Sequence, residues 1–462
     1  MAKVPERMPY NPPILRTLFI LLVFTGGCTS VPSFQLTPTQ EVKVAPTLTP
    51  APDSNWTLPA PGIDTIPIQD SRAEIAITNQ RLDGNRLVTG SGGMPVEAID
   101  IPLLGKPLWV VAASVSSGSI WAAALENGQV QMFQVVGDTV SEITPNVSRL
   151  PAGMPPVLQV AGERTALISP APDASAATNA ILLEDGAQAY IDAHGQLRLI
   201  RQEVAYTLAA DALPDARILS DGEGRLLFLS TPTSEYPHGV LGDEFEAKTI
   251  TLVNAIDIPD FLRVIWIDPG DVIEGIAPIW VDLDGDGSRE IIVTQSNARS
   301  GARLVVYNED GSLFASGESI GQGFRWRHQL AVGQFIAGGS QEIAVIRTPH
   351  IGGVIEIYAV EQDRLVIQAE LSGYSSHLIG SRNLDGALAA DLDGDGQIEI
   401  VVPDQSHTIL AGIEMVGAEL KIAWEASIGG RLTTNITAVQ LPTGKIALGV
   451  GHDLNRLRIW LP

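Results

Sequence analysis

The stretch "WVDLDGDGSREIIV", from Trp280 to Val293, holds four carboxylates within nine residues and continues directly into an apolar segment. The carboxylates are those of Asp282, Asp284, Asp286 and Glu290. They fall at positions 1, 3, 5 and 9 of a polar loop that has a glycine at position 6, where a sharp turn is needed. Such a loop can present several oxygens to one hard divalent cation. The stretch therefore predicts a cation-binding turn between two β-strands.

The same pattern of strand, nine-residue loop, Glu and strand recurs along the C-terminal half of the chain. Related stretches run from 331 to 347 and from 389 to 405, so that the Glu falls at 290, 342 and 399. A worn fourth copy, "TAVQLPTGKIALGV", has Lys445 in place of the Glu. Each copy continues into two further strands, as in "ARLVVYNEDGSLFASGE", where Asp310-Gly311 is typical of a tight hairpin turn. Four strands every fifty-odd residues are typical of one β-propeller blade.

The N-terminal half shows a looser form of this pattern. Four strands are expected in Pro107–Ile143, in Pro155–Tyr206 and in Asp215–Asp268. We therefore predict an all-β fold, a β-propeller of seven four-stranded blades. The last blade is short, so a segment between about residues 73 and 100, such as "AEIAITNQR", is expected to supply the missing strand and close the ring.

The N-terminus resembles a bacterial lipoprotein signal peptide. Basic residues precede the uncharged run "TLFILLVFTGGC", which is too short to span a bilayer and ends at Cys28, the only cysteine. Thr25 stands where lipoboxes usually have Leu. We expect a signal peptide (1–27), lipidation at Cys28, a Thr/Pro-rich tether (28–65) and the propeller (66–462). The alternative is an ordinary secretion signal with an incidental cysteine.

Composition and charge limit the classes of binding partner that we expect. The formal net charge is −24, and such an acidic surface repels phosphate backbones, so nucleic-acid binding is not expected. We expect the chain in the cell envelope, lipid-anchored on the extracytoplasmic side. With a single cysteine the domain has to be stable without an internal disulfide.

Residues 275–462 resemble the FG-GAP or VCBS repeat family, whose calcium loops occur in integrin α-subunit propellers and in many secreted bacterial proteins. The resemblance implies two structural Ca²⁺ sites. Their ligands would be Asp282, Asp284, Asp286, Ser288 (through its carbonyl) and Glu290 in one loop, and Asp391, Asp393, Asp395, Gln397 and Glu399 in the other. Gln334, Ile336 and Gly338 replace the aspartates in the middle copy, so no calcium is expected there. The alternative is a catalytic or regulatory ion.

Histidines and arginines concentrate in loops that a propeller would place on the face away from calcium. The candidate ligand-binding residues are Arg325, Trp326, Arg327, His328, Arg347, His350, His377, Arg382 and Asn383. Together they would form a cationic, hydrogen-bonding patch, since Arg suits carboxylate or sulfate groups and Trp can stack on a sugar. The alternative is that these side chains only cap the carbonyls of neighbouring loops.

These observations predict a non-enzymatic, surface-anchored binding protein, for example an adhesion module, whose ligand is a polysaccharide or a protein. One alternative is a polysaccharide lyase-like enzyme that uses the His/Arg face and would need a deep pocket there. Another is a scaffold subunit of an envelope complex, which would show an exposed apolar patch.

Overall fold

The computed structural model describes residues 74–78 and 81–462. The predicted signal peptide, Cys28, the tether and the first residues of the predicted propeller domain lie outside the described residues. The part of the chain that is described is all-β and contains no helix. Accordingly, it offers no helix with the length and apolarity that crossing a bilayer would require.

Most of the described strands form antiparallel sets of four, and the members of most sets are consecutive in sequence. The N-terminal sets are β4 (Pro107–Val115), β5 (Gly118–Leu125), β6 (Val130–Val136) and β7 (Thr139–Ile143); β10 (Ile181–Leu182), β11 (Gln188–Ile191), β12 (Leu197–Arg201) and β13 (Val204–Leu208); and β14 (Leu219–Ser220), β15 (Arg225–Thr233), β16 (Glu246–Asn254) and β17 (Asp260–Trp266). The C-terminal sets are β18 (Val272–Val281), β19 (Glu290–Asn297), β20 (Gly301–Asn308) and β21 (Leu313–Ser316); β22 (Arg327–Gly333), β23 (Glu342–Arg347), β24 (Val354–Glu361) and β25 (Arg364–Ser372); β26 (Leu388–Asp391), β27 (Glu399–Pro403), β28 (Ile409–Val416) and β29 (Glu419–Ser427); and β30 (Leu432–Gln440), β31 (Ile446–His452) and β32 (Arg456–Trp460) with β3 (Ala98–Pro102).

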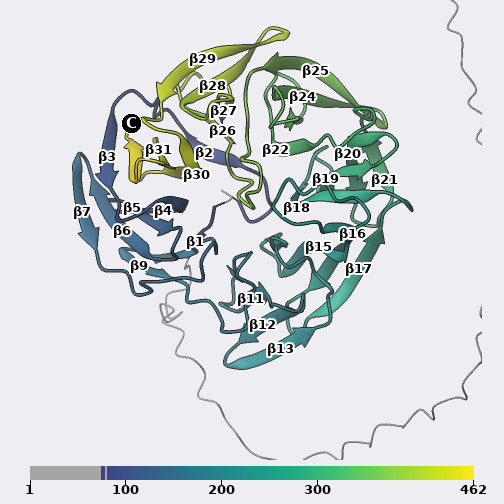
Figure 1. Ribbon diagram of the computed structural model, residues 1–462, viewed down its shortest axis with the longest axis horizontal. Helices are drawn as coiled ribbons and strands as arrows, with labels where there is room; N and C mark the ends of the chain where they lie inside the picture. Colours follow the sequence, from purple (N-terminus) through teal and green to yellow (C-terminus); the bar gives the residue numbers. More distant parts are fainter. Residues whose placement is uncertain (1–73, 79–80) are drawn as a thin grey trace, which may run out of the picture. The chain divides into compact units, whose positions relative to one another are not determined.

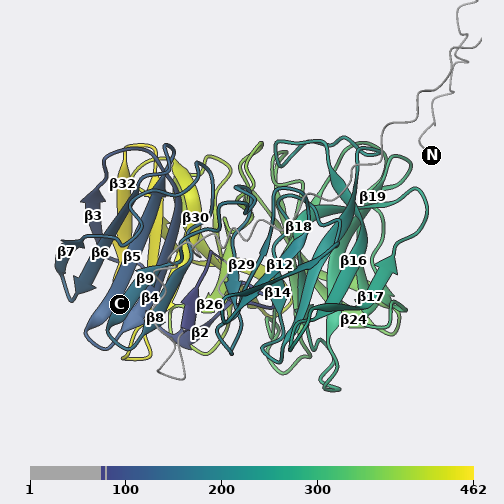
Figure 2. The same cartoon turned by 90° about the horizontal axis from the view of Figure 1, so that it is seen from below.

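Consecutive sets follow one another around a common centre (Figure 1), and their strands run between two faces (Figure 2). Burial changes across a set as this arrangement requires. Every residue of β18, a first strand, is buried, whereas six of the seven residues of the fourth strand β17 are exposed. The hydrophobic core therefore lies between the inner strands of neighbouring sets.

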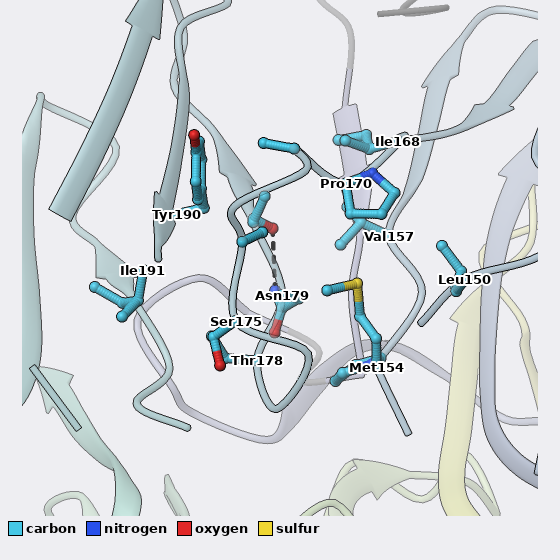
Figure 3. Close-up of a pocket in the computed structure, with 14 residues that line it drawn as sticks. Leu150, Met154, Val157, Ile168, Pro170, Ser175, Thr178, Asn179, Tyr190 and Ile191 are labelled. Atoms are coloured by element: carbon cyan, nitrogen blue, oxygen red, sulfur yellow. Dashed lines mark hydrogen bonds between the residues drawn. The ribbon is translucent and has the colours of Figure 1, made fainter. Parts of the chain in front are cut away.

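The predicted blade at Pro155–Tyr206 contains a four-stranded set, β10 to β13, but the expectation that the blade begins at Pro155 is wrong. The first two strands of this range, β8 (Leu158–Ala161) and β9 (Arg164–Leu167), form a separate three-stranded sheet with β1 (Glu74–Ala76). A Pro- and Ala-rich connection follows β9, and the Asn146 amide binds both the backbone N–H and the carbonyl of Leu167. This connection lines a mainly apolar cavity of about 20 Å³ between Met154 and Tyr190 (Figure 3). That volume suits about one water molecule, so the cavity is a packing gap and no ligand site.

An N-terminal strand does complete the last set, but the example "AEIAITNQR" is wrong. Within it, Glu74–Ala76 pairs with β8. The strand that pairs with β32 is β3, which lies at the C-terminal end of the predicted segment of about residues 73 to 100. Its Ile101 packs in a buried cluster with Trp121 and Ile459, and Asp100 forms an ion pair with Arg458. This apolar and ionic fit explains why β3 takes the position.

The chain between β1 and β3 crosses the centre of the molecule, and we call residues 82–93 the central segment. Its backbone carbonyls accept hydrogen bonds from Ser220, Trp280 and Ala389, which belong to β14, β18 and β26. The Asn85 side chain binds both the N–H and the carbonyl of Val332 in β22. Within this segment, β2 (Leu87–Ser91) then pairs in parallel with β26. One short stretch therefore ties the first strands of four consecutive sets together.

Candidate functional site

The first acidic loop, residues 282–290, joins β18 to β19. Carboxylate oxygens of Asp282, Asp284 and Glu290 all lie within 4.8 Å of one another. Asp282 is held by its own loop, because its two oxygens accept the N–H groups of Gly285 (2.7 Å) and Gly287 (3.0 Å). Both glycines have positive φ, which lets the backbone turn toward the carboxylate. Three predicted calcium ligands are thus brought together at one point.

The second acidic loop, residues 391–399, joins β26 to β27. Here the oxygens within 4.8 Å of one another are those of Asp391, Asp393 and Asp395. Glu399 is instead occupied by N–H donors, from the Leu392 backbone (2.7 Å), the Asp393 backbone (3.2 Å) and the Trp424 indole (3.3 Å). The two loops therefore gather different sets of three carboxylates.

The middle loop, residues 334–342, has the Glu but no Asp, so it shows what the Glu does in a loop where no cation is expected. Glu342 accepts the N–H groups of Phe335 (2.9 Å) and Ile336 (3.1 Å), as Glu290 accepts that of Leu283 (2.8 Å). This loop has no Asp, and the Gln334 amide closes it by donating to the Gly339 carbonyl. The Glu therefore closes the loop with or without the aspartates, and the aspartates are what distinguishes the two acidic loops from this one.

The donor set of both acidic loops fits calcium. It contains only oxygen donors, which a hard cation prefers, and no His or Cys, which zinc or copper would favour. Burial first, and then the neighbouring aspartates, raise the pKa of Glu290 to about 7. Carboxylates packed this closely repel one another, and a divalent cation would relieve that repulsion. If calcium binds, Asp282, Asp284 and Glu290 would hold it in one loop, and Asp391, Asp393 and Asp395 in the other.

Four of the nine predicted ligand residues form a packed aromatic cluster. Trp326 stacks on His328 with ring centroids 4.8 Å apart and meets His377 edge-on at 5.2 Å. His350 lies 4.9 Å from His377. Trp326, His328 and His377 are each at most 2% exposed. These side chains are buried against one another, so the Trp326 indole has no exposed face on which a sugar could stack.

Hydrogen bonds fix the tautomers in this cluster. His377 Nε2 lies 2.6 Å from the Ser381 carbonyl oxygen, which can only accept, so Nε2 carries the proton. His377 Nδ1 is then an acceptor, and His350 Nε2 donates to it at 2.7 Å. Burial lowers the pKa of His377 to about 3 and that of His350 to about 4. Both rings are therefore neutral at pH 7.

The arginines predicted to form a cationic patch are mostly neutralised by acidic residues. Arg327 is 5% exposed and donates to Glu356, which also pairs with Arg347. Arg382 binds Asp215 at 3.0 Å and Asp243 at 2.7 Å. Arg325 is exposed. The partners of Arg382 are 167 and 139 positions away in the sequence, so local patterns could not reveal them, whereas Glu356 lies only nine residues from Arg347, on the neighbouring strand.

Two long loops that carry several of these residues meet each other, and we call residues 234–245 and 373–387 the cover loops. The Gly380 N–H donates to the Val240 carbonyl at 2.8 Å. Val240, Leu241 and Leu384 pack with Trp326 in a small buried cluster, and the pair between Arg382 and Asp243 adds an ionic contact. The two cover loops are therefore packed against each other.

An open cleft of about 410 Å³ lies beside the cover loops. Arg382 and Asn383 line one side, and Gly153 and Ala177 lie among the small residues that line it elsewhere. Leu108 and Trp109, at the start of β4, also contribute. The Asn383 amide donates to the Leu108 carbonyl at 3.3 Å, which fixes its orientation. Two predicted ligand residues thus meet at a cavity large enough for a small ligand.

A buried acidic group on the same face was not predicted. Glu274, which is 1% exposed, lies 2.5 Å from His238 Nδ1, and its other oxygen accepts the Ser296 hydroxyl. Burial, followed by the charge of Glu274, raises the pKa of Glu246 well above its ordinary value. Both glutamates lie within strands, at positions that alternation alone assigns to the core. No sequence signal distinguished them.

Comparisons with known proteins give no family for this chain. No family model matches it, and no curated protein matches it. Among solved structures, a chain of "Crystal Structure of Mitotic Checkpoint Complex" is 11% identical with a TM-score of 0.42, and the match covers 81% of this chain and 97% of that one. For "Crystal structure of WD40 beta propeller domain of Doa1" the identity is 9% and the TM-score 0.40, with 79% and 96% covered. The resemblance to FG-GAP or VCBS repeats stays a prediction.

Proposed function

We propose that the chain is an exported, lipid-anchored binding protein whose folded part is a closed, seven-bladed β-propeller stabilised by calcium. The pairing of β3 with β32 supports closure, because it joins the first and last parts of the described chain. The two groups of converging carboxylates support calcium. Both groups lie in turns between first and second strands, where a bound ion would cross-link a turn. Neither loop needs a catalytic role.

The observation that carries the binding function is the cleft of about 410 Å³ beside the cover loops. Arg382 and Asn383 would orient a ligand there, while small residues leave room for its backbone or ring. Because Arg382 already binds two carboxylates, the cleft does not favour an anion. The proposed ligand is therefore a neutral polysaccharide segment or a peptide rather than an acidic glycan.

Filling the cleft tests this assignment. Ala177→Trp would place an indole among the small lining residues without removing an ion pair. Glycan and peptide arrays probed with the chain from Leu58 onward should lose binding in this variant. Ala205→Trp, on the exposed strand β13, is the matched control and should bind like the unaltered chain. Equal binding by both variants would contradict ligand binding at the cleft.

A scaffold function is the second candidate, because one outer strand carries an apolar surface. On β17, Phe261, Leu262, Val264 and Trp266 are 39–67% exposed, and Trp266 is the most exposed of them. Among the described strands, β17 pairs only with β16. Exposed apolar surfaces of this kind often mark protein contacts. Photo-crosslinking from position 262 in cells that produce the chain should capture one discrete protein partner, and crosslinking from position 205 should not.

The lyase-like alternative gains no such support. Its candidate base and charge-neutralising groups were His328, His350, His377, Arg327 and Arg382. Of these, only Arg382 lines the cleft. His328 and His377 are buried, and Arg327 lines another cavity, next to Tyr358. The two arginines of this set thus line different cavities.

A further inference from the structure

The two acidic loops hold their first aspartate in different ways. In the first loop, both oxygens of Asp282 accept backbone N–H groups of that same loop. In the second loop, Asp391 Oδ1 accepts the Gly394 N–H at 2.7 Å, as the first loop would predict. Its Oδ2, however, accepts the hydroxyl of Ser91 at 2.8 Å. A residue of the central segment thus takes the role that a loop glycine has in the first loop.

The position of Ser91 is fixed by backbone contacts on both sides. The N–H of Gly92 donates to the Asp391 carbonyl at 2.8 Å, and the N–H of Ile446 donates to the Gly92 carbonyl at 2.8 Å. Gly93 has a φ of +126°, and a Cβ there would lie 1.9 Å from the Ile446 carbonyl oxygen. Only glycine allows this approach. The strand end is therefore held between the second acidic loop and the worn fourth copy of the repeat.

We infer that Ser91 is a positioning residue of the second cation site, and that a cation bound there fastens the N-terminal strands β2 and β3 to the fold. The inference rests on the proposed calcium function. By donating to Oδ2, the Ser91 hydroxyl fixes the Asp391 carboxylate next to those of Asp393 and Asp395. Groups that orient metal ligands in this way commonly change metal affinity about 10- to 100-fold.

Linkage makes the effect reciprocal. If docking of β2 strengthens cation binding at Asp391, cation binding strengthens docking of β2 by the same factor. The first acidic loop is different. Among the described residues, the hydrogen bonds that its carboxylates accept come from backbone N–H groups of the same loop. A cation there would leave Ser91 unaffected.

Calcium titration of the full chain in detergent, followed by calorimetry, tests the inference. Asp284→Asn leaves the second site for measurement, and Asp393→Asn leaves the first. Adding Ser91→Ala to Asp284→Asn should weaken calcium binding about 10-fold or more. Adding it to Asp393→Asn should change nothing. Ser91→Thr, which keeps the hydroxyl, should restore binding and shows that the alanine variant has not simply unfolded.

Limited proteolysis provides an independent readout. Glu97, which is exposed between β2 and β3, is a cleavage site for an endoproteinase that cuts after Glu. Calcium should slow this cleavage in Asp284→Asn but not in Asp393→Asn. The inference is wrong if Ser91→Ala leaves calcium binding unchanged and calcium protects Glu97 from cleavage equally in Asp284→Asn and Asp393→Asn. This outcome leaves the proposed calcium function intact. An absence of calcium binding in the unaltered chain overturns the inference together with the proposed calcium function.

Discussion

At the scale of single residues, Glu356 is the shared partner of two arginines inside the fold. It is fully buried and accepts hydrogen bonds from Arg327 (3.1 Å), from Arg347 and from the Tyr358 hydroxyl (2.7 Å). Glu356→Gln should lower the free energy of unfolding by about 3–5 kcal/mol, because it leaves the buried charge of Arg327 without its counter-charge. Urea denaturation measures this change.

The matched control is Glu370, the other carboxylate partner of Arg347. Its side chain is 48% exposed, so Glu370→Gln should cost less than about 1 kcal/mol. If the two variants were equally stable, Arg327 would not depend on Glu356 for its charge balance. The difference between them therefore measures the effect of burial on an ion pair of the same chemical type.

Because several histidines are buried, we expect the free energy of unfolding to decrease as the pH falls. Burial lowers the pKa of His377 to about 3 and that of His407 to about 4, below the ordinary value of 6.5 that the unfolded chain retains. Below pH 6.5 the unfolded state therefore binds more protons, and stability decreases as the pH falls. Each such histidine contributes up to about 1.4 kcal/mol per pH unit. Asp215 has the opposite sign, because burial raises its pKa to about 6 and its contribution is lost as the pH rises through that value.

His377→Gln isolates the histidine effect from that of the carboxylates. An amide can still donate to the Ser381 carbonyl and accept from His350, but it does not titrate. Between pH 6 and pH 4.5, the unfolding free energy of this variant should depend less on pH than that of the unaltered chain. Ala205→Gln, which introduces the same amide on the exposed strand β13, should leave the pH dependence unchanged. Identical slopes in all three proteins would contradict the assignment.

At the scale of elements, the central segment and β3 should be required for the fold. A chain that starts at Glu74 keeps β1, β2 and β3 and should unfold cooperatively. A chain that starts at Leu104 loses these strands, the Asn85 contacts to β22 and the buried ion pair between Arg86 and Asp385. It should lose cooperative unfolding, as measured by circular dichroism during heating. If both chains had the same midpoint, the N-terminal strands would be dispensable.

Strands and turns could be predicted from the sequence where their signals are local. Alternation of apolar residues and pairs such as Asp310-Gly311 identified the hairpins of β18 to β32 because these signals act over a few residues. The pairing of Arg86 with Asp385 and that of Arg382 with Asp215 join residues 299 and 167 positions apart. No local pattern encodes such pairs. For the same reason, a cationic patch was predicted where the fold brings in acidic partners.

The acidic loops were the part of the candidate site that could be predicted best. Spacing and residue type are enough to bring Asp282 and Asp284 together, since both belong to one short loop. Spacing could not show that Ser91 reaches Asp391 or that Glu399 is occupied by the Trp424 indole. Arg382 and Asn383, which line the cleft, could be predicted only as members of loops rich in polar and basic residues. Their common cavity depends on loops from several sets of strands.

At the scale of the whole molecule, calcium should stabilise the fold through both acidic loops. With the dissociation constants of about 10⁻⁴–10⁻³ M that are typical of extracellular modules, 10 mM calcium adds about 1.4–2.7 kcal/mol per site. Urea denaturation with calcium and with a chelator measures the gain. The double variant Asp284→Asn, Asp393→Asn should lose it, whereas Asp138→Asn, at an exposed hairpin, should keep it. A calcium effect that persists in the double variant would place the ions elsewhere.

The central segment has a consequence for the order of folding. It is synthesised before every strand of the four-stranded sets, yet its backbone hydrogen-bond partners extend from Ser220 to Ala389 and on to Gly444. A nascent chain therefore cannot complete the pairing of this segment until its last quarter has been made. Folding dominated by such distant contacts is slow, and incomplete chains expose unpaired strand edges. Synthesis of the segment that contains Ala389 and Gly444 should therefore precede the final packing of the central segment.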